Sequence, residues 1–311
     1  LSYALFEGRP LTTRGRWINP LVFAHFSLEK RLPQLKAVKA PIFILGTGRS
    51  GTTILGIVLS MHREVGFLNE PKALWHALRD DEDLIGSYTH IPARYRLDAE
   101  DASPAIISAA HRLYGAYLRT TFNDRVVDKY PELIFRVPFV KKIFPDARFL
   151  FLVRNGWDTC HSIDAWSARS GLRLRTEVHD WWGVNRRKWH LLVEQLVGEY
   201  ADLAPHLEDM CGWTNHADMA AVEWIVTMRE GLRLLREYPN DVLRVTYEDI
   251  CQSPRLVMGG VCEFANLSWD EVFMRYAVHT LRPAMPKNPF PLAAAIEVPF
   301  RDTMNALGYN G

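Results

Sequence analysis

A glycine-rich loop that follows a short apolar run most constrains how this chain can fold. The run Pro41-Ile-Phe-Ile-Leu45 is bounded by proline and glycine, which is typical of a buried parallel strand. The loop Gly46-Thr-Gly-Arg-Ser-Gly-Thr-Thr53 comes next, and the apolar residues of 52–61 share one helical face. Glycines permit a tight turn and a close ligand approach, and free N–H groups at a helix start bind anions. We therefore expect an anion-binding loop, with a turn that only joins strand to helix as the alternative.

Short apolar runs alternate with helical patterns along the rest of the chain. Such alternation predicts an α/β fold, with a central parallel sheet flanked by helices and ligands bound at the carboxyl ends of the strands. Residues 1–40 are expected to be an N-terminal extension packing on the core, and 41–311 one domain with an irregular, Trp-rich cap insertion at about 169–215. The predicted strands are 65–68, 125–128, 148–153 and 242–246, and the predicted helices are 70–79, 103–120, 131–144, 155–167, 216–238 and 253–264.

Composition excludes several classes of protein. The 37 Lys and Arg nearly balance the 36 Asp and Glu, and the net charge of +1 does not favour a general nucleic-acid binder. No run of about 18 apolar residues occurs, so no transmembrane span is predicted. The four cysteines are too scattered for a disulfide framework. The even spacing of His206, Cys211 and His216 is a thin metal signal, because zinc sites show tighter ligand pairs.

The residues after the glycine loop distinguish it from the loop of nucleotide hydrolases. The spacing matches G-x-x-x-x-G, but Thr52 and Thr53 follow where such enzymes carry a lysine for the terminal phosphates. The apolar strand 148–153 is followed by Arg154, where a metal-binding aspartate would be expected. An arginine there repels Mg²⁺ and attracts an anion. The pattern predicts a phosphate-type ligand bound without metal, with a metal-dependent P-loop kinase as the alternative.

Several blocks of the sequence resemble the sulfotransferase family, over roughly 41–71, 126–166 and 242–265. The loop G-x-x-R-S-G-T-T is similar to the one that binds the 5′-phosphosulfate of 3′-phosphoadenosine 5′-phosphosulfate (PAPS), and its arginine is closer to the carbohydrate and protein-tyrosine branches. The block Phe149 to Ser162 resembles the family's 3′-phosphate motif, in which a serine follows a strand-ending arginine by eight residues. The resemblance implies PAPS as donor and 3′,5′-adenosine bisphosphate (PAP) as product. It implies the donor-binding residues Gly48, Arg49, Ser50, Gly51, Thr52, Thr53, Arg154, Ser162 and Tyr247.

Sulfuryl transfer needs positive charge around the transferring group and a base for the acceptor hydroxyl. Arg49 and Lys129 are the expected cations, since Asp-Lys-Tyr-Pro after strand 125–128 is similar to a Lys-x-Pro block of the family. Glu70 is the expected base, because its place after the second strand resembles that of the family's catalytic glutamate. His62, on the helix after the loop, is a further candidate base.

Each of these assignments has a structural alternative. Lys129 could be a surface lysine at a strand end, and Tyr247 a core tyrosine. Glu70 could lie in the first turn of a helix capped by Asn69, where a carboxylate complements the helix dipole.

Tryptophans cluster in the second half of the chain, with seven of the ten between residues 157 and 224. Sugars and flat apolar ligands pack on indole faces, but a lid with buried tryptophans would give the same pattern. We expect an acceptor hydroxyl on a carbohydrate, glycolipid or hydroxylated small molecule, with protein tyrosine and a non-catalytic PAPS-binding scaffold as alternatives. The excess of arginine over lysine is typical of GC-rich bacterial genomes, so we expect a cytoplasmic protein, or a lumenal one if a leader was removed.

Overall fold

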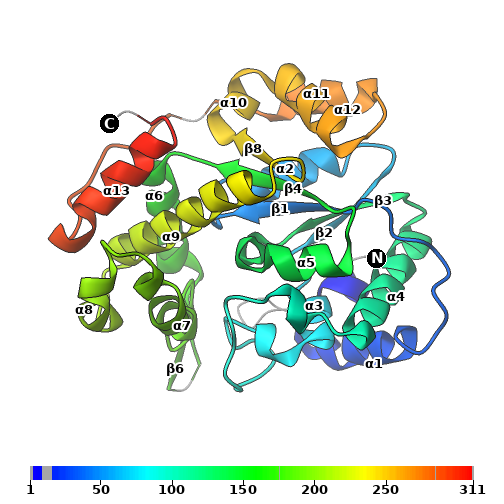
Figure 1. Cartoon of the computed structure of the whole chain (residues 1–311), viewed down its shortest axis with the longest axis horizontal. Helices are drawn as coiled ribbons and strands as arrows, with labels where there is room; N and C mark the ends of the chain where they lie inside the picture. Colours follow the sequence, from blue (N-terminus) through cyan, green and yellow to red (C-terminus); the bar gives the residue numbers. More distant parts are fainter. Residues whose placement is uncertain (1–2, 9–15, 175, 284, 310–311) are drawn as a thin grey trace.

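The computed structural model describes residues 3–8, 16–174, 176–283 and 285–309 (Figure 1). A five-stranded sheet lies at its centre in the order β2-β3-β1-β4-β8, and all neighbouring strands are parallel. This is the predicted α/β fold with a central parallel sheet. The strands are β1 (Ile42–Gly46), β2 (Val65–Asn69), β3 (Arg125–Lys129), β4 (Arg148–Val153) and β8 (Val242–Thr246).

Helices cover both faces of the sheet. Alternate residues of each strand point to opposite faces, and both sets are apolar, so each face is buried under helices. Phe43 and Phe149 stack on one side with ring centroids 5.5 Å apart, whereas Ile44 and Leu150 belong to the core on the other side. The Ile44 side is covered by α2 (Thr52–Leu59), α10 (Tyr247–Gln252), α11 (Pro254–Ala265) and α12 (Glu271–Thr280). The Phe43 side is covered by α3 (Lys72–Leu78), α4 (Pro104–Thr121), α5 (Val137–Ile143), α6 (Gly156–Ser170), α9 (His216–Glu237) and α13 (Ala294–Ala306).

The N-terminal part contains a helix that the sequence analysis did not predict. α1 (Asn19–Glu29) has Pro20 in its first turn, where a missing N–H costs nothing. Phe6 and Phe26 are fully buried, and α1 packs against α3 and α4. These residues therefore belong to the same hydrophobic core as the sheet.

The segment 169–215 was expected to be irregular, and that prediction is wrong. β5 (Leu172–Leu174), β6 (Glu177–Asp180) and β7 (Gly183–Val184) form an antiparallel sheet, followed by α7 (Arg187–Gln195) and α8 (Leu207–Cys211). Its tryptophans divide into two groups. Trp182 and Trp189 are fully buried and pack edge to face, whereas Trp181 is only partly buried.

The carboxyl ends of the sheet strands meet along one edge, as parallel pairing requires. The register places Asn69 beside Lys129, and Gly46 beside Leu152. The helix predicted over 131–144 is instead a 3₁₀ helix over Pro131–Arg136 followed by α5. No helix in the described ranges is both long enough and apolar enough to cross a membrane.

Candidate active site

The glycine loop joins β1 to α2 at the carboxyl edge of the sheet. Arg49 and Gly51 have φ angles of 68° and 102°, in the left-handed region. A Cβ at Gly51 would lie 2.3 Å from Cδ2 of Tyr247, so this position has no room for a side chain. α2 begins at Thr52 without a side-chain cap, which leaves the N–H groups of its first turn without helical partners. The loop can therefore bind an anion at the positive end of the helix dipole.

Arg49, Arg154 and Ser162 lie together, although Asn155 and the first six residues of α6 separate the last two. The Nε of Arg49 donates to Oγ of Ser162 at 3.2 Å, and a terminal nitrogen of Arg154 donates to the Arg49 carbonyl at 3.2 Å. The guanidinium of Arg154 lies 4.4 Å from the ring centroid of Tyr247. Arg154 and Ser162 therefore both lie beside Arg49 of the glycine loop.

The surroundings of this cluster neutralise its positive charge only in part. Burial and the neighbouring Arg169 and Arg154 lower the pKa of Arg49, against the smaller opposing effect of Glu70. Arg154 has Asp158 at 3.7 Å, but its Nε is buried and finds no hydrogen-bond partner in the described part of the chain. A buried donor without a partner is costly, so an anionic ligand would relieve the cost.

Glu70 and Lys129 face each other at the ends of β2 and β3. Glu70 follows β2 with φ of 53°, and its N–H donates to the Lys129 carbonyl at 2.7 Å. Nζ of Lys129 donates to one carboxylate oxygen of Glu70 at 2.5 Å, and Nζ of Lys72 lies 3.3 Å from the other. Glu70 therefore does not lie in the first turn of a helix, and Asn69 is a strand residue, not a helix cap.

The charges around Glu70 set its protonation. Burial acts to raise the pKa of Glu70, but Lys129 and Lys72 outweigh burial and hold that pKa well below its usual range. Lys129 is 1% exposed, so it is not a surface lysine, while the Glu70 side chain is 38% exposed. Glu70 is an ionised carboxylate that a ligand can reach.

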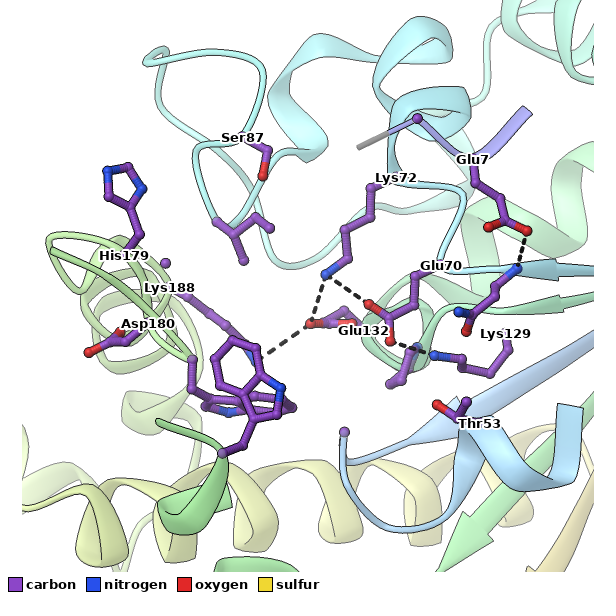
Figure 2. Close-up of a pocket in the computed structure, with 18 of the residues that line it drawn as sticks. Glu7, Thr53, Glu70, Lys72, Ser87, Lys129, Glu132, His179, Asp180 and Lys188 are labelled. Carbon is purple, nitrogen blue, oxygen red and sulfur yellow. Dashed lines mark hydrogen bonds and ion pairs between the residues drawn. The ribbon is translucent and has the colours of Figure 1, made fainter. Parts of the chain in front are cut away.

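Glu70 and Lys129 both line a cavity of about 270 Å³, and Figure 2 shows the side chains around it. Gly48 and Thr53 of the glycine loop line it, so the cavity adjoins the anion-binding loop. A Cβ on Gly48 would lie 2.4 Å from Cη2 of Trp181, which means that the antiparallel sheet packs directly on the loop. The charged and aromatic lining residues are Glu7, Glu70, Lys72, Lys129, Glu132, Trp166, His179, Asp180, Trp181 and Lys188.

A second group of charges, on the cavity wall and directly behind it, escaped the sequence analysis: Lys72, Glu132 and Lys188 line the cavity, and Glu223 contacts Lys188 from behind. Glu132 lies 4.0 Å from Nζ of Lys72 and 3.5 Å from Nζ of Lys188. Nζ of Lys188 lies 2.5 Å from Glu223, whose other oxygen accepts a 2.7 Å hydrogen bond from Nε1 of Trp181. The only signal in the sequence was Glu223, a charged residue amid the apolar run 219–228 of α9.

His62 does not serve this site. The side chain is 1% exposed, its Nε2 bonds to the Ser268 carbonyl at 2.8 Å, and its Nδ1 accepts from the Glu64 N–H at 3.2 Å. It packs edge to face on Phe273 of α12 and does not line the cavity. Nor do the described residues contain a group of three His, Cys, Asp or Glu side chains that could hold a metal ion.

Comparison with known proteins agrees with this geometry. Residues 41–271 match the model of the "Sulfotransferase family". The chain is 23% identical over 239 residues to protein-tyrosine sulfotransferase A of Caenorhabditis elegans (76% of this chain, 52% of that protein). It is 28% identical over 238 residues to the protein-tyrosine sulfotransferase of Drosophila melanogaster (76% of this chain, 40% of that protein), so it spans about half the length of these relatives.

The fold has solved counterparts. The sulfotransferase domain from the curacin biosynthetic pathway superposes with a TM-score of 0.50 at 16% identity, covering 88% of this chain and 99% of that domain. The sulfotransferase domain of the Synechococcus PCC 7002 olefin synthase also gives 0.50, at 19% identity, covering 90% of this chain and 98% of that domain. With a family match across most of its length, this chain belongs to the sulfotransferase family.

Proposed function

We propose that this protein transfers a sulfuryl group from PAPS to an acceptor hydroxyl. The observation that carries the proposal is the Glu70–Lys129 pair, which lies in a cavity whose wall continues into the anion-binding loop. A base for a hydroxyl and a cation for the transferring group are what in-line transfer needs. Membership of the sulfotransferase family supports the same reaction.

The donor side suits PAPS. Gly48 to Thr53, with Arg49, would hold the 5′-phosphosulfate, and Arg154 with Ser162 would hold the 3′-phosphate. Tyr247 would support Arg154, since it lies under that guanidinium. The buried Nε of Arg154, which finds no partner among the described residues, fits this assignment. Bound PAPS supplies an activated sulfuryl group whose leaving group is a phosphate, and the arginines and lysines supply charge in place of a metal.

Glu70 would take the proton of the acceptor hydroxyl. A carboxylate with so low a pKa is a weak base, because proton affinity and base strength fall together. Lys129 lies within reach of both Glu70 and the cavity. When Lys129 turns from Glu70 to an oxygen of the sulfuryl group, Glu70 loses its strongest cationic neighbour and its pKa rises. Binding of the donor thus prepares the base.

The acceptor classes that we propose are carbohydrates, glycolipids and hydroxylated small molecules. Trp166 and Trp181 line the cavity and offer flat apolar surface for such molecules. A protein-tyrosine acceptor is the second candidate, favoured by the similarity to the two animal tyrosine sulfotransferases.

The test measures PAP release from PAPS with a panel of sugars, phenols, alcohols and tyrosine peptides, in EDTA and in Mg²⁺. We expect transfer in EDTA, and a loss of at least about 100-fold in kcat for Glu70→Gln, the scale of a general-base contribution. Glu297→Gln is the control, since Glu297 is a carboxylate of α13 that does not line the cavity. Turnover of ATP that requires Mg²⁺, without transfer from PAPS, would instead support a kinase.

A further inference from the structure

The cavity and the glycine loop differ in how their positive charge is balanced. Three lysines, Lys72, Lys129 and Lys188, line the cavity. We propose that the acceptor is uncharged and carries a ring, because these lysines are already neutralised by carboxylates of the chain. This inference rests on the proposed function and narrows its acceptor class.

The lysines and carboxylates alternate in a row along the cavity wall, and the last carboxylate, Glu223, lies behind the wall. Glu70 contacts Lys129 at 2.5 Å and Lys72 at 3.3 Å. Glu132 contacts Lys72 at 4.0 Å and Lys188 at 3.5 Å. The row ends where Lys188 meets Glu223 at 2.5 Å.

In this row three positive charges are matched by three negative charges. The row is also deeply set, since the exposed fractions of its side chains range from 1% to 13%, except for Glu70 at 38%. A carboxylate or sulfate on the acceptor would have to displace a carboxylate of the protein to gain a lysine. It would also lie near the remaining carboxylates, where like charges repel strongly because water is excluded. The row therefore disfavours anionic acceptors.

The donor side shows the opposite pattern. Arg49 there meets a hydroxyl, Ser162, and burial together with two further arginines lowers its pKa. Arg154 keeps a buried nitrogen for which the described residues offer no partner. Anions are thus attracted to the loop, and the acceptor cavity beside it adds no free cation from the described chain. This difference gives each substrate its own half of the site.

Trp181 provides the surface for a ring. Glu223 accepts its Nε1 hydrogen, Nζ of Lys188 lies 4.6 Å from its ring centroid, and Trp166 packs against it edge to face at 5.4 Å. Its far edge abuts Gly48 of the glycine loop. An indole fixed in this way and lining the cavity can take the flat or weakly polar face of an aromatic ring or a sugar.

Glu132 is the residue whose removal would unbalance the row. It is the one carboxylate that lies between Lys72 and Lys188 within the described wall, so Glu132→Gln leaves each lysine with a single carboxylate partner. The variant would then attract the anionic acceptors that the wild type rejects. Glu194→Gln is the matched control, because Glu194 is an exposed carboxylate on the same helix as Lys188 and does not line the cavity.

Two matched pairs of acceptors test the proposal: 4-nitrophenyl β-glucoside with its glucuronide, and 2-naphthol with 6-hydroxy-2-naphthoate. We would measure kcat/KM with PAPS, and acceptor binding to the PAP complex by calorimetry. We expect the uncharged member to be favoured by at least about 30-fold in the wild type, about 2 kcal/mol by the usual conversion. Glu132→Gln should narrow that ratio at least 10-fold, and Glu194→Gln should leave it unchanged.

The outcomes separate this inference from the proposed function. Equal or better use of the carboxylated members by the wild type would overturn the inference, whether or not Glu132→Gln folds. So would a PAP complex that binds none of the four compounds. Failure to bind PAP and to transfer from PAPS to any acceptor would instead overturn the proposed function.

Discussion

Asp128 provides a direct test of the electrostatics of this fold. Its side chain is fully buried, and both Tyr114 (2.5 Å) and Trp75 (2.9 Å) donate to a single oxygen, Oδ2. The other oxygen has no partner in the described part of the protein. Burial outweighs these hydrogen bonds and the charge of Lys129, and raises the pKa of Asp128 to about 7.

The raised pKa makes stability depend on pH in a defined direction. An unfolded aspartate has a pKa of about 3.9, so between about pH 4 and 7 the folded state binds the proton and the unfolded state does not. The free energy of unfolding therefore falls as pH rises through this window. A shift of about three units corresponds to about 4 kcal/mol lost between pH 4 and pH 8.

Asp128→Asn removes the ionisation and keeps an acceptor for the two donors. We expect the variant to be about as stable as the wild type at pH 4, and about 3–4 kcal/mol more stable at pH 8. Urea unfolding across this pH range measures the free energy of unfolding of both proteins. Burial also raises the pKa of Glu82 to about 7, but Glu82 is present in both proteins, so its contribution cancels in the difference between them. Asp124→Asn, at a carboxylate that is 76% exposed, is the control. Parallel curves for wild type and Asp128→Asn would refute the reasoning.

Three further predictions concern the site. Gly51→Ala should weaken PAP binding at least about 10-fold by calorimetry, because a Cβ at φ 102° meets Tyr247 and such strain costs on the order of 1–3 kcal/mol; unchanged affinity would contradict the loop geometry. Arg154→Ala should raise the Kd for PAP by about 10- to 100-fold, because a charged hydrogen bond to the 3′-phosphate is lost. The Kd for adenosine 5′-phosphate, which lacks that phosphate, should rise less. Lys72→Met should shift the acid limb of the kcat–pH profile to higher pH, since Lys72 helps to lower the pKa of Glu70; an unmoved limb would show that another group titrates.

The sheet was predictable because its strands are continuous apolar runs. β4 and β8 have the predicted bounds, and β4 is buried on both faces between helices. The glycine loop was predictable for a related reason. A buried strand followed by a glycine turn and an apolar helix places the turn at the carboxyl end of the strand, next to the start of the helix. α1 could not be predicted in the same way, because proline usually interrupts a helix, whereas Pro20 lies in the first turn of α1.

The turn at Glu70 could not be predicted from local preferences. Asn69 and Pro71 are typical of a helix start, but the pairing of β2 with β3 extends the strand through Asn69. Glu70 is then held in a left-handed conformation by its hydrogen bond to the Lys129 carbonyl, a residue 59 positions away. Tertiary contacts overrode the local signal.

The row of charges on the cavity wall lay further beyond sequence reasoning. Its members come from the ends of β2 and β3, the start of α3, the 3₁₀ helix at Pro131–Arg136, α7 and α9. No spacing rule connects Lys188 to Glu132 or to Glu223, because only the packing of the antiparallel sheet and α7 on the core brings them together. The tryptophan cluster signalled the region, but not which of its indoles are buried in the core and which, namely Trp166 and Trp181, line the cavity.

The placement of Glu70 carries a consequence for how the proposed reaction is controlled. Without donor, two lysines hold this carboxylate, so it is ionised but a poor base. Lys129 is nearly inaccessible to solvent, so an oxygen that enters beside it competes with Glu70 directly. A bound sulfuryl group offers such oxygens, and a water molecule is a weaker competitor because it carries no net charge. The proposed base would therefore gain strength only when the donor is in place, which couples removal of the acceptor proton to the presence of a sulfuryl group that can be transferred.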